Sequence, residues 1–228
     1  MKTLDWRNDR LRVKTLLQAE QSAGEVFVRG WLRTVRRSKG VNFLALNDGS
    51  CLDNLQVVVS EESPAFAISD RLGTGFCVGI RGSMVPSPGQ GQNWEVQAEE
   101  VIVYGQADDA FPLQKKRHGF EFLRSIAHLR PRTNAFGAVF RVRSRIAHAV
   151  HTFFQERGFL YVHSPIITAN DCEGAGEMFR VTTLDPENTP QIDGRIAWHE
   201  DFFGTKTGLT VSGQLQGELF ATAFTDIY

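Results

Sequence analysis

Two groups of side chains in this sequence have types and spacings that suit ligand binding. The first combines cations with an aromatic ring and an amide, and it comprises Arg29, Arg33, Arg36, Phe43 and Gln56. Cationic side chains hold phosphates, an exposed aromatic ring stacks on an unpaired base, and a side-chain amide bonds a base edge. These residues could therefore bind single-stranded RNA. On the sequence alone, Phe43 could equally be a core residue, and the arginines could be an ordinary solvated surface.

The second group contains carboxylates beside small residues. Glu173 precedes a Gly-Ala-Gly run, which would let the backbone approach a small ligand closely, although a surface loop is the other interpretation. Further along, Glu218 directly follows Gly217. A buried carboxylate accepts hydrogen bonds from a side-chain amide but repels a second carboxylate. A carboxylate such as Glu218 would therefore favour an amide over a carboxylate in any ligand beside which it is buried.

The composition is that of a globular protein without a strong overall charge. Hydrophobic residues make up 42% of the 228 residues, charged residues make up 22%, and the net charge is −1. No apolar run has the length of a membrane span, and the first residues lack the apolar core of a secretion signal. We therefore expect a cytoplasmic protein with no membrane contact. The separated Cys51, Cys77 and Cys172 predict neither a disulfide framework nor a metal site.

The arginines and Phe43 fall in a region whose apolar residues recur at every second position. After a helix expected over about 4–19, five strands are predicted around residues 26–32, 43–46, 55–59, 76–85 and 94–103, with a short helix near 64–72. Five strands with a helix after the third indicate an OB-fold barrel, although another small barrel would fit the same pattern. We expect this domain to cover residues 1–105, followed by a hinge over 106–132.

The third region, residues 133–228, opens with an amphipathic helix. Apolar residues recur at three- and four-residue steps from Phe136 to Phe154, and Thr133 or Asn134 can cap the helix. Gly158 lies where a helix end favours a residue that can adopt positive φ. Because proline cannot donate a ladder hydrogen bond, the strand after Gly158 should end at Pro165 or lie at a sheet edge.

A long helix, a glycine, an aromatic strand and a proline, in this order, resemble motif 1 of the class II aminoacyl-tRNA synthetases. The resemblance implies an α+β fold in which the OB-fold barrel precedes the beginning of a class II catalytic domain. It also implies a homodimer whose interface includes Gly158 and Pro165. The barrel resembles the anticodon-binding domain of the aspartyl, asparaginyl and lysyl enzymes. By that resemblance Phe43 stacks on an anticodon base, Gln56 contacts a base edge, and the arginines bind tRNA.

The segment from Leu209 to Glu218 resembles the Ser-x-Gln-Leu segment of the aspartyl and asparaginyl enzymes. The resemblance places Ser212 and Gln214 at the amino acid and pairs Glu173 with its α-ammonium group. Aspartyl enzymes carry a lysine where this sequence has Gly217, so the resemblance favours asparagine, with Glu218 as the reader of its amide. Glu177 and Glu200 remain alternatives for that role. The implied partners are asparagine, ATP with Mg²⁺, and tRNA(Asn).

The same resemblance implies catalysis by positioning and by charge stabilisation rather than by a covalent nucleophile, and no Ser-His-Asp or Cys-His signature is present. Motifs 2 and 3, which complete the ATP site in this family, are not recognisable up to Tyr228. We therefore expect a truncated form without activity of its own, although a natural short protein would look the same. A non-catalytic RNA-binding module and an aspartyl or non-discriminating relative are the alternative functions.

Overall fold

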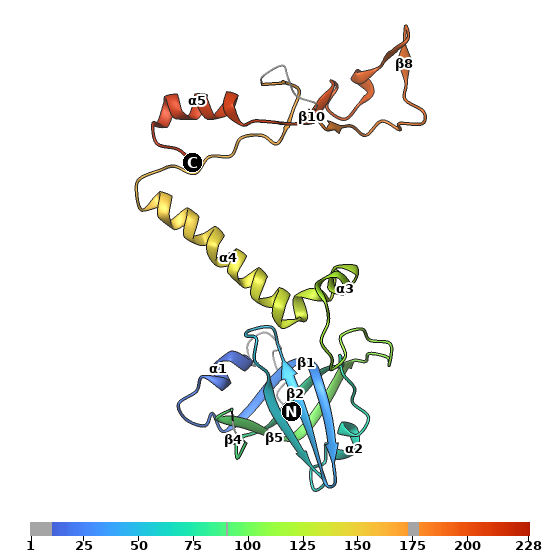
Figure 1. Cartoon of the computed structure of the whole chain (residues 1–228), viewed down its shortest axis with the longest axis vertical. Coiled ribbons are helices and arrows are strands. Elements are labelled where there is room, and N and C mark those ends of the chain that lie inside the picture. Colours follow the sequence, from blue (N-terminus) through green and yellow to red (C-terminus); the bar gives the residue numbers. More distant parts are fainter. Residues whose placement is uncertain (1–10, 90, 173–177) are drawn as a thin grey trace, which may run out of the picture. The chain divides into compact units, whose positions relative to one another are not determined.

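The computed structural model describes residues 11–89, 91–172 and 178–228. The chain forms two compact units, Met1–Val142 and Arg143–Tyr228. Figure 1 follows the elements along the chain.

The first unit contains a closed five-stranded barrel in the order β1-β2-β3-β5-β4, so the predicted OB-fold is confirmed. Neighbouring strands are antiparallel except β3 and β5, which run parallel. The strands are β1 (Glu25–Ser38), β2 (Val41–Asn47), β3 (Leu55–Ser60), β4 (Cys77–Pro86) and β5 (Trp94–Gly105). Between β3 and β4 lies α2 (Phe66–Ser69), as predicted but shorter.

Alternating side chains of these strands fill the barrel. Leu32, Leu44, Leu55, Val57 and Ile80 are almost fully buried in one apolar cluster, while the residues between them face outward, as the period of two requires.

The strand β1 is long enough to pair with β4 along its first half and with β2 along its second half. Gly30 lies at the change of partner. A Cβ atom at this position would lie 2.2 Å from the carbonyl oxygen of Asn47, so the backbone approaches too closely for any side chain.

The N-terminal helix α1 (Val13–Leu17) is shorter than predicted at its C-terminal end, and residues 1–10 lie outside the described part. Its first turn is held by the loop after β2, because the Val13 amide donates to Asp48 Oδ2 (3.0 Å) and the Lys14 amide donates to Ser50 Oγ (3.0 Å). Val13 and Leu16 are buried in the barrel core. The helix therefore covers one end of the barrel.

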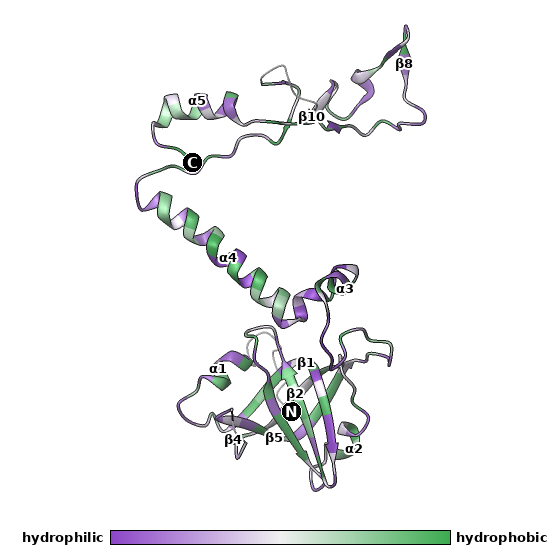
Figure 2. Cartoon of the chain, in the orientation of Figure 1, coloured by the Kyte–Doolittle hydropathy of each residue, from purple (hydrophilic) through white to green (hydrophobic). Residues whose placement is uncertain are grey.

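The hinge contains α3 (Phe120–Ser125) and the 3₁₀ turn η1 (Arg130–Arg132) before the long helix α4 (Asn134–Gln155) begins. The Phe136 amide donates to Thr133 Oγ1 (3.4 Å), so Thr133 is the capping residue. Gly158 has φ +84°, which confirms the predicted positive φ after the helix. Figure 2 shows the alternating apolar and polar bands along α4.

In the second unit the strands are short. One sheet has the order β6-β10-β7, from β6 (Ile167–Thr168), β7 (Arg180–Val181) and β10 (Thr207–Leu209). A hairpin joins β8 (Gln191–Ile192) to β9 (Arg195–Ile196), and η2 (Trp198–Glu200) and α5 (Gln214–Phe224) complete the unit.

The segment before Pro165 pairs in parallel with the last residues of the chain. The Leu160 amide donates to the Asp226 carbonyl (2.9 Å), and the Val162 amide donates to the Tyr228 carbonyl (3.1 Å). Apart from this bridge at Leu160, residues 159–166 form no strand, so the prediction of a strand between Gly158 and Pro165 is wrong, and the next strand begins after the proline, at Ile167. Tyr228 also stacks on Phe154, with ring centroids 4.7 Å apart.

Candidate functional site

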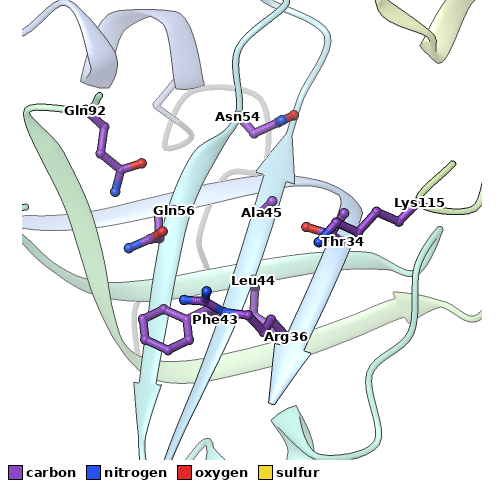
Figure 3. A pocket seen from close by; sticks show the side chains of 9 residues that line it. All are labelled: Thr34, Arg36, Phe43, Leu44, Ala45, Asn54, Gln56, Gln92 and Lys115. Carbon is purple, nitrogen blue, oxygen red and sulfur yellow. The ribbon is translucent and has the colours of Figure 1, made fainter. Parts of the chain in front are cut away.

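A pocket of about 320 Å³ opens on the outer face of the barrel, and we call it the barrel pocket. Strands β1, β2 and β3 provide most of its wall, and single residues from the β4–β5 loop and from the hinge complete it (Figure 3). Its lining consists of Thr34, Arg36, Phe43, Leu44, Ala45, Asn54, Gln56, Gln92 and Lys115.

Phe43 lies in this pocket and not in the core. Its neighbours Asn42 and Leu44 are buried, so the alternation along β2 directs the half-buried Phe43 ring outward. The β1–β2 register places Arg36 directly opposite Phe43. The guanidinium of Arg36 lies 4.4 Å from the ring centroid, within the range of a cation–π contact. The pair thus forms a partly exposed aromatic surface with a cation beside it.

Gln56 reaches the same pocket from β3, and a buried carboxylate fixes its side chain. Gln56 Nε2 donates to Glu95 Oε2 (3.0 Å), and Ser87 Oγ donates to the same oxygen (2.9 Å). Gln97 Nε2 donates to Glu95 Oε1 (2.8 Å), so Glu95 is satisfied by neutral donors. These bonds determine how the Gln56 amide is presented to the pocket.

The sequence interpretation missed Glu95 and Lys115. Glu95 becomes a neighbour of Gln56 because β3 and β5 run parallel side by side, and they are not consecutive in sequence. Alternation along the fifth strand could have placed Glu95 on the outer face, but it gives no information on which strand lies beside it. Lys115 lies in the hinge, where the sequence has no hydrophobic periodicity from which the direction of a side chain could be predicted.

Of the three arginines grouped in the sequence, the structure places Arg36 alone in the barrel pocket. Arg29 lies on the half of β1 that pairs with β4, with its guanidinium 4.9 Å from the Phe27 ring centroid. Arg33 donates from Nη1 to the carbonyl oxygen of Arg132 in the hinge, and burial lowers the pKa of its guanidinium. The three guanidinium groups thus lie in three different environments.

In the second unit, the candidate residues for the amino acid gather at the start of α5. The Gln214 amide nitrogen donates to Ser212 Oγ (3.1 Å), and Gln214 Nε2 donates to Glu218 Oε1 (2.8 Å). Glu218 therefore accepts a side-chain amide in this structure, although it is exposed and not buried.

The remaining carboxylate candidates do not join this group. Glu173 and Glu177 lie outside the described residues. Glu200 is exposed in η2, with its Oε1 3.9 Å from Nε2 of His199.

A pocket of about 430 Å³ lies between β7 and β10 of the second unit. Arg180, Lys206 and Asp171 line it with charged groups of both signs. Gly208 forms part of the wall, and a Cβ atom there would lie 2.9 Å from the Phe179 carbonyl oxygen. The arrangement suits a small ligand that carries both charges.

Asp201 anchors the loop after η2. Its Oδ1 accepts hydrogen bonds from the Thr183 amide (2.9 Å), from Thr183 Oγ1 (2.9 Å) and from the Phe202 amide (2.8 Å). Hydrogen bonds from the Thr182 side chain and then from the Thr183 amide lower the pKa of Asp201 from 3.8 to about 2. The carboxylate thus joins the segment after β7 to the loop before β10.

We expect Asp201→Asn to destabilise the chain, with an effect that depends on pH between 2 and 4. Since the folded pKa lies below the unfolded one, the charged form stabilises the fold above about pH 4, and this contribution disappears as pH falls toward 2. Thermal melts across this range should show the difference between wild type and variant shrinking with acidification. Asp185→Asn, an exposed carboxylate of the same unit, serves as the control. A difference that stays constant with pH would contradict this account.

The described residues include neither a helix long and apolar enough to cross a membrane nor a group of three metal-binding side chains. One face of α4, however, exposes large apolar side chains to solvent. These are Val139, Phe140, Val142, Ile146, Val150 and Phe153. The predicted burial of this face is therefore not achieved within the described chain.

Two family descriptions match consecutive parts of the chain. Residues 26–104 match an OB-fold nucleic acid binding domain, and residues 121–228 match the class II tRNA synthetases (D, K and N).

Curated relatives extend the similarity over nearly the whole chain. The asparagine–tRNA ligase of Geobacter metallireducens is 61% identical over 219 residues, which cover 96% of this chain and 48% of the relative. The asparagine–tRNA ligase of Porphyromonas gingivalis W83 is 50% identical over 227 residues, which cover 99% of this chain and 48% of the relative. The chain thus spans about half the length of these relatives.

Solved structures show the same fold at low identity. Asparaginyl-tRNA synthetase from Pyrococcus horikoshii, complexed with asparaginyl-adenylate, matches with a TM-score of 0.73 at 20% identity, covering 95% of this chain and 46% of that chain. A putative aspartyl-tRNA synthetase from Leishmania major matches with a TM-score of 0.73 at 18% identity, covering 98% of this chain and 42% of that chain.

Proposed function

We propose that this chain forms the N-terminal half of an asparagine–tRNA ligase, because it belongs to the class II tRNA synthetases of the D, K and N group. Such a ligase joins the asparagine carboxylate to the α-phosphate of ATP, releasing pyrophosphate, and then transfers the acyl group from the adenylate to a terminal ribose hydroxyl of tRNA(Asn), releasing AMP. We assign residues 1–105 to anticodon binding, residues 106–132 to the hinge and residues 133–228 to the first part of the catalytic domain. We propose that this ligase acts in the cytoplasm.

The barrel pocket is the observation that carries the proposal. Phe43 presents a ring on which an anticodon base can stack, Arg36 provides a cation beside it, and Gln56 presents an oriented amide to the base edge. Base stacking, phosphate binding and edge reading are the three interactions by which proteins bind single-stranded RNA. Arg29 and Arg33 would then contact the tRNA backbone outside this pocket.

For the amino acid, we propose that Ser212 and Gln214 contact asparagine, that Glu173 pairs with its α-ammonium group, and that Glu218 reads its side-chain amide. The bond from Gln214 to Glu218 supports the last role, because it is a carboxylate–amide contact of the kind that asparagine would make. Glu218 would repel the side-chain carboxylate of aspartate. Sites built around such a hydrogen bond can reject the wrong ligand by as much as ~10⁴-fold.

The family implies ATP and Mg²⁺, and we assign no residue of this chain to their binding. No group of metal-binding side chains is placed for Mg²⁺ among residues 11–89, 91–172 and 178–228.

We propose further that the ligase is a homodimer through α4 and the segment from Gly158 to Pro165. The exposed apolar side chains of α4 support this, because a second copy would remove them from water.

A non-catalytic RNA-binding module is the second candidate, and it is favoured by the closed barrel with a pocket lined within one unit. The aspartyl alternative has less support, because Gly217 provides no cation for an aspartate carboxylate.

We expect the 228-residue chain to bind an anticodon stem-loop of tRNA(Asn) and to catalyse no asparagine-dependent exchange between ATP and pyrophosphate. The barrel pocket is complete, whereas no phosphate-gripping residues of motifs 2 and 3 are recognisable in the chain. Fluorescence anisotropy measures the binding, with a stem-loop of altered anticodon as the control. Exchange with asparagine would show that residues of this chain build an ATP site, and equal affinity for both stem-loops would contradict anticodon recognition.

A further inference from the structure

A second pocket of the first unit, of about 350 Å³, lies between β1, the hinge and the first turn of α4, and we call it the hinge pocket. Its lining includes Arg33 from β1, Lys116 and Arg117 from the hinge, and residues 133–135 at the start of α4. It shares no lining residue with the barrel pocket.

The hinge pocket carries positive charge that no described carboxylate neutralises. In the described part of the chain, ion pairs join Arg81 to Glu25 and Glu100, and His199 to Glu200, and none involves Arg33, Lys116 or Arg117. No aspartate or glutamate lines the pocket.

The positive charge of Arg33 is energetically unfavourable without a paired anion, because the side chain is partly removed from water. Its guanidinium is half-buried and donates a hydrogen bond to the neutral carbonyl group of Arg132. Burial lowers the pKa of Arg33, which is the mark of a cation that has lost water without gaining an anion. Cations removed from water are normally paired, so the site is suited to an anion from outside the chain.

The hinge connects the two pockets through consecutive residues. Lys115 lines the barrel pocket, and Lys116 and Arg117 line the hinge pocket. A ligand that places one group in the barrel pocket therefore has a run of cations leading to the other pocket. The sugar–phosphate backbone of RNA has this form, because it repeats an anion at every nucleotide.

We propose that the hinge pocket binds a backbone phosphate of the same RNA whose base is held in the barrel pocket, with Lys116, Arg117 and Arg33 as its ligands. This rests on the proposed function and adds to it a contact that positions the RNA without reading its sequence. The first turn of α4 adds a favourable dipole to the same site. Because phosphate contacts fix register while base contacts specify, the two pockets have separable effects.

The test uses the double variant Lys116→Gln/Arg117→Gln in the 228-residue chain. Both side chains are exposed, so the barrel should remain folded. The control, Arg12→Gln/Lys14→Gln, removes the same charge from exposed residues that line neither pocket. Affinities for two stem-loops, one with the asparagine anticodon and one with an altered anticodon, are measured over a series of salt concentrations.

We expect the hinge variant to bind both stem-loops about tenfold more weakly and to lower the salt-dependence slope by about 0.7–0.9, which is the contribution of one phosphate contact. The ratio of the two affinities should not change. An unchanged slope, or a loss equal to that of the control, would overturn the proposal.

A titration with inorganic phosphate distinguishes binding of an RNA backbone from binding of a free anion. Amide NMR signals of Asn134 and Ala135 should shift with RNA in the wild type and lose this shift in the hinge variant. If phosphate alone produces the full shift and RNA adds nothing, the pocket holds a free anion and the proposal fails. If the wild type cannot distinguish the two stem-loops but its slope still exceeds that of the hinge variant, anticodon recognition fails and the phosphate contact stands.

Discussion

Replacing Phe43 by alanine should weaken binding of the tRNA(Asn) anticodon stem-loop by about 10- to 100-fold, because stacking of a base on an aromatic ring contributes about 1–3 kcal/mol. The ring lies on the outer face of β2 in the barrel pocket, beside Arg36. Its removal takes away the stacking surface and also the ring that holds the Arg36 guanidinium in place. Anisotropy titrations at one fixed salt concentration measure the loss.

Two further variants show which property of Phe43 matters. Phe43→Tyr keeps the aromatic face and should bind nearly as the wild type does, whereas Phe43→Leu keeps apolar bulk without the ring and should lose most of the affinity. Circular dichroism should show all three variants folded, because Leu44 and Leu46, and not Phe43, are the residues that this strand contributes to the core. If Phe43→Ala binds as tightly as the wild type, the barrel pocket is not the base-binding site.

Replacing Gly30 by alanine should destabilise the barrel by at least about 3 kcal/mol, at the upper end of what overpacking costs. The new Cβ atom would lie 2.2 Å from the carbonyl oxygen and 2.8 Å from the carbonyl carbon of Asn47. These are backbone atoms of β2, so no side-chain rotation can relieve the clash. Relief requires β1 and β2 to separate at Asn47. Urea unfolding followed by tryptophan fluorescence measures the change.

Gly119→Ala is the matched control for this experiment. A Cβ atom at Gly119 meets nothing within 4 Å, and the backbone there has φ −72°, which any residue adopts. The control should therefore unfold at nearly the wild-type urea concentration. If Gly30→Ala is as stable as Gly119→Ala, the contact between β1 and Asn47 is not rigid.

The barrel could be predicted from the sequence because its determinants are local. A period of two, interrupted by turns such as the one at Asp48-Gly49, determines the extent and inner face of each strand, and the five strands appear at the expected places. The same alternation could have placed Phe43 outward. The choice between core and surface stayed open because both faces of this strand carry apolar residues, with Ala45 on the face of Phe43 and Leu44 and Leu46 on the other face.

The composition of the barrel pocket could be predicted only in part. Phe43, Arg36 and Gln56 lie on successive strands, so sequence order brings them close. Glu95 depends on the β3–β5 pairing, and Lys115 depends on the path of the hinge, and neither leaves a periodic signal.

The second unit was less predictable for a different reason. Its strands have two or three residues each, too few to show a period, and Leu160 pairs with Ile227 across most of the unit. Ser212, Gln214 and Glu218 came together because they follow one another on a loop and a helix. The neighbourhood of Asp201, by contrast, depends on contacts that only the folded loops create.

The pairing of β1 with β4 and of β3 with β5 has a consequence for the time at which the barrel forms during synthesis. Glu25 must find Ser83, and Gln56 must find Glu95, so closure needs contacts between distant parts of the chain. Such non-local contacts slow folding, since the entropy of closing long loops is lost before the strands pair. On the ribosome, β1 to β3 can form a meander early, but its edges stay open until β5 has emerged. The barrel pocket is therefore complete only when Lys115 follows β5 out of the exit tunnel.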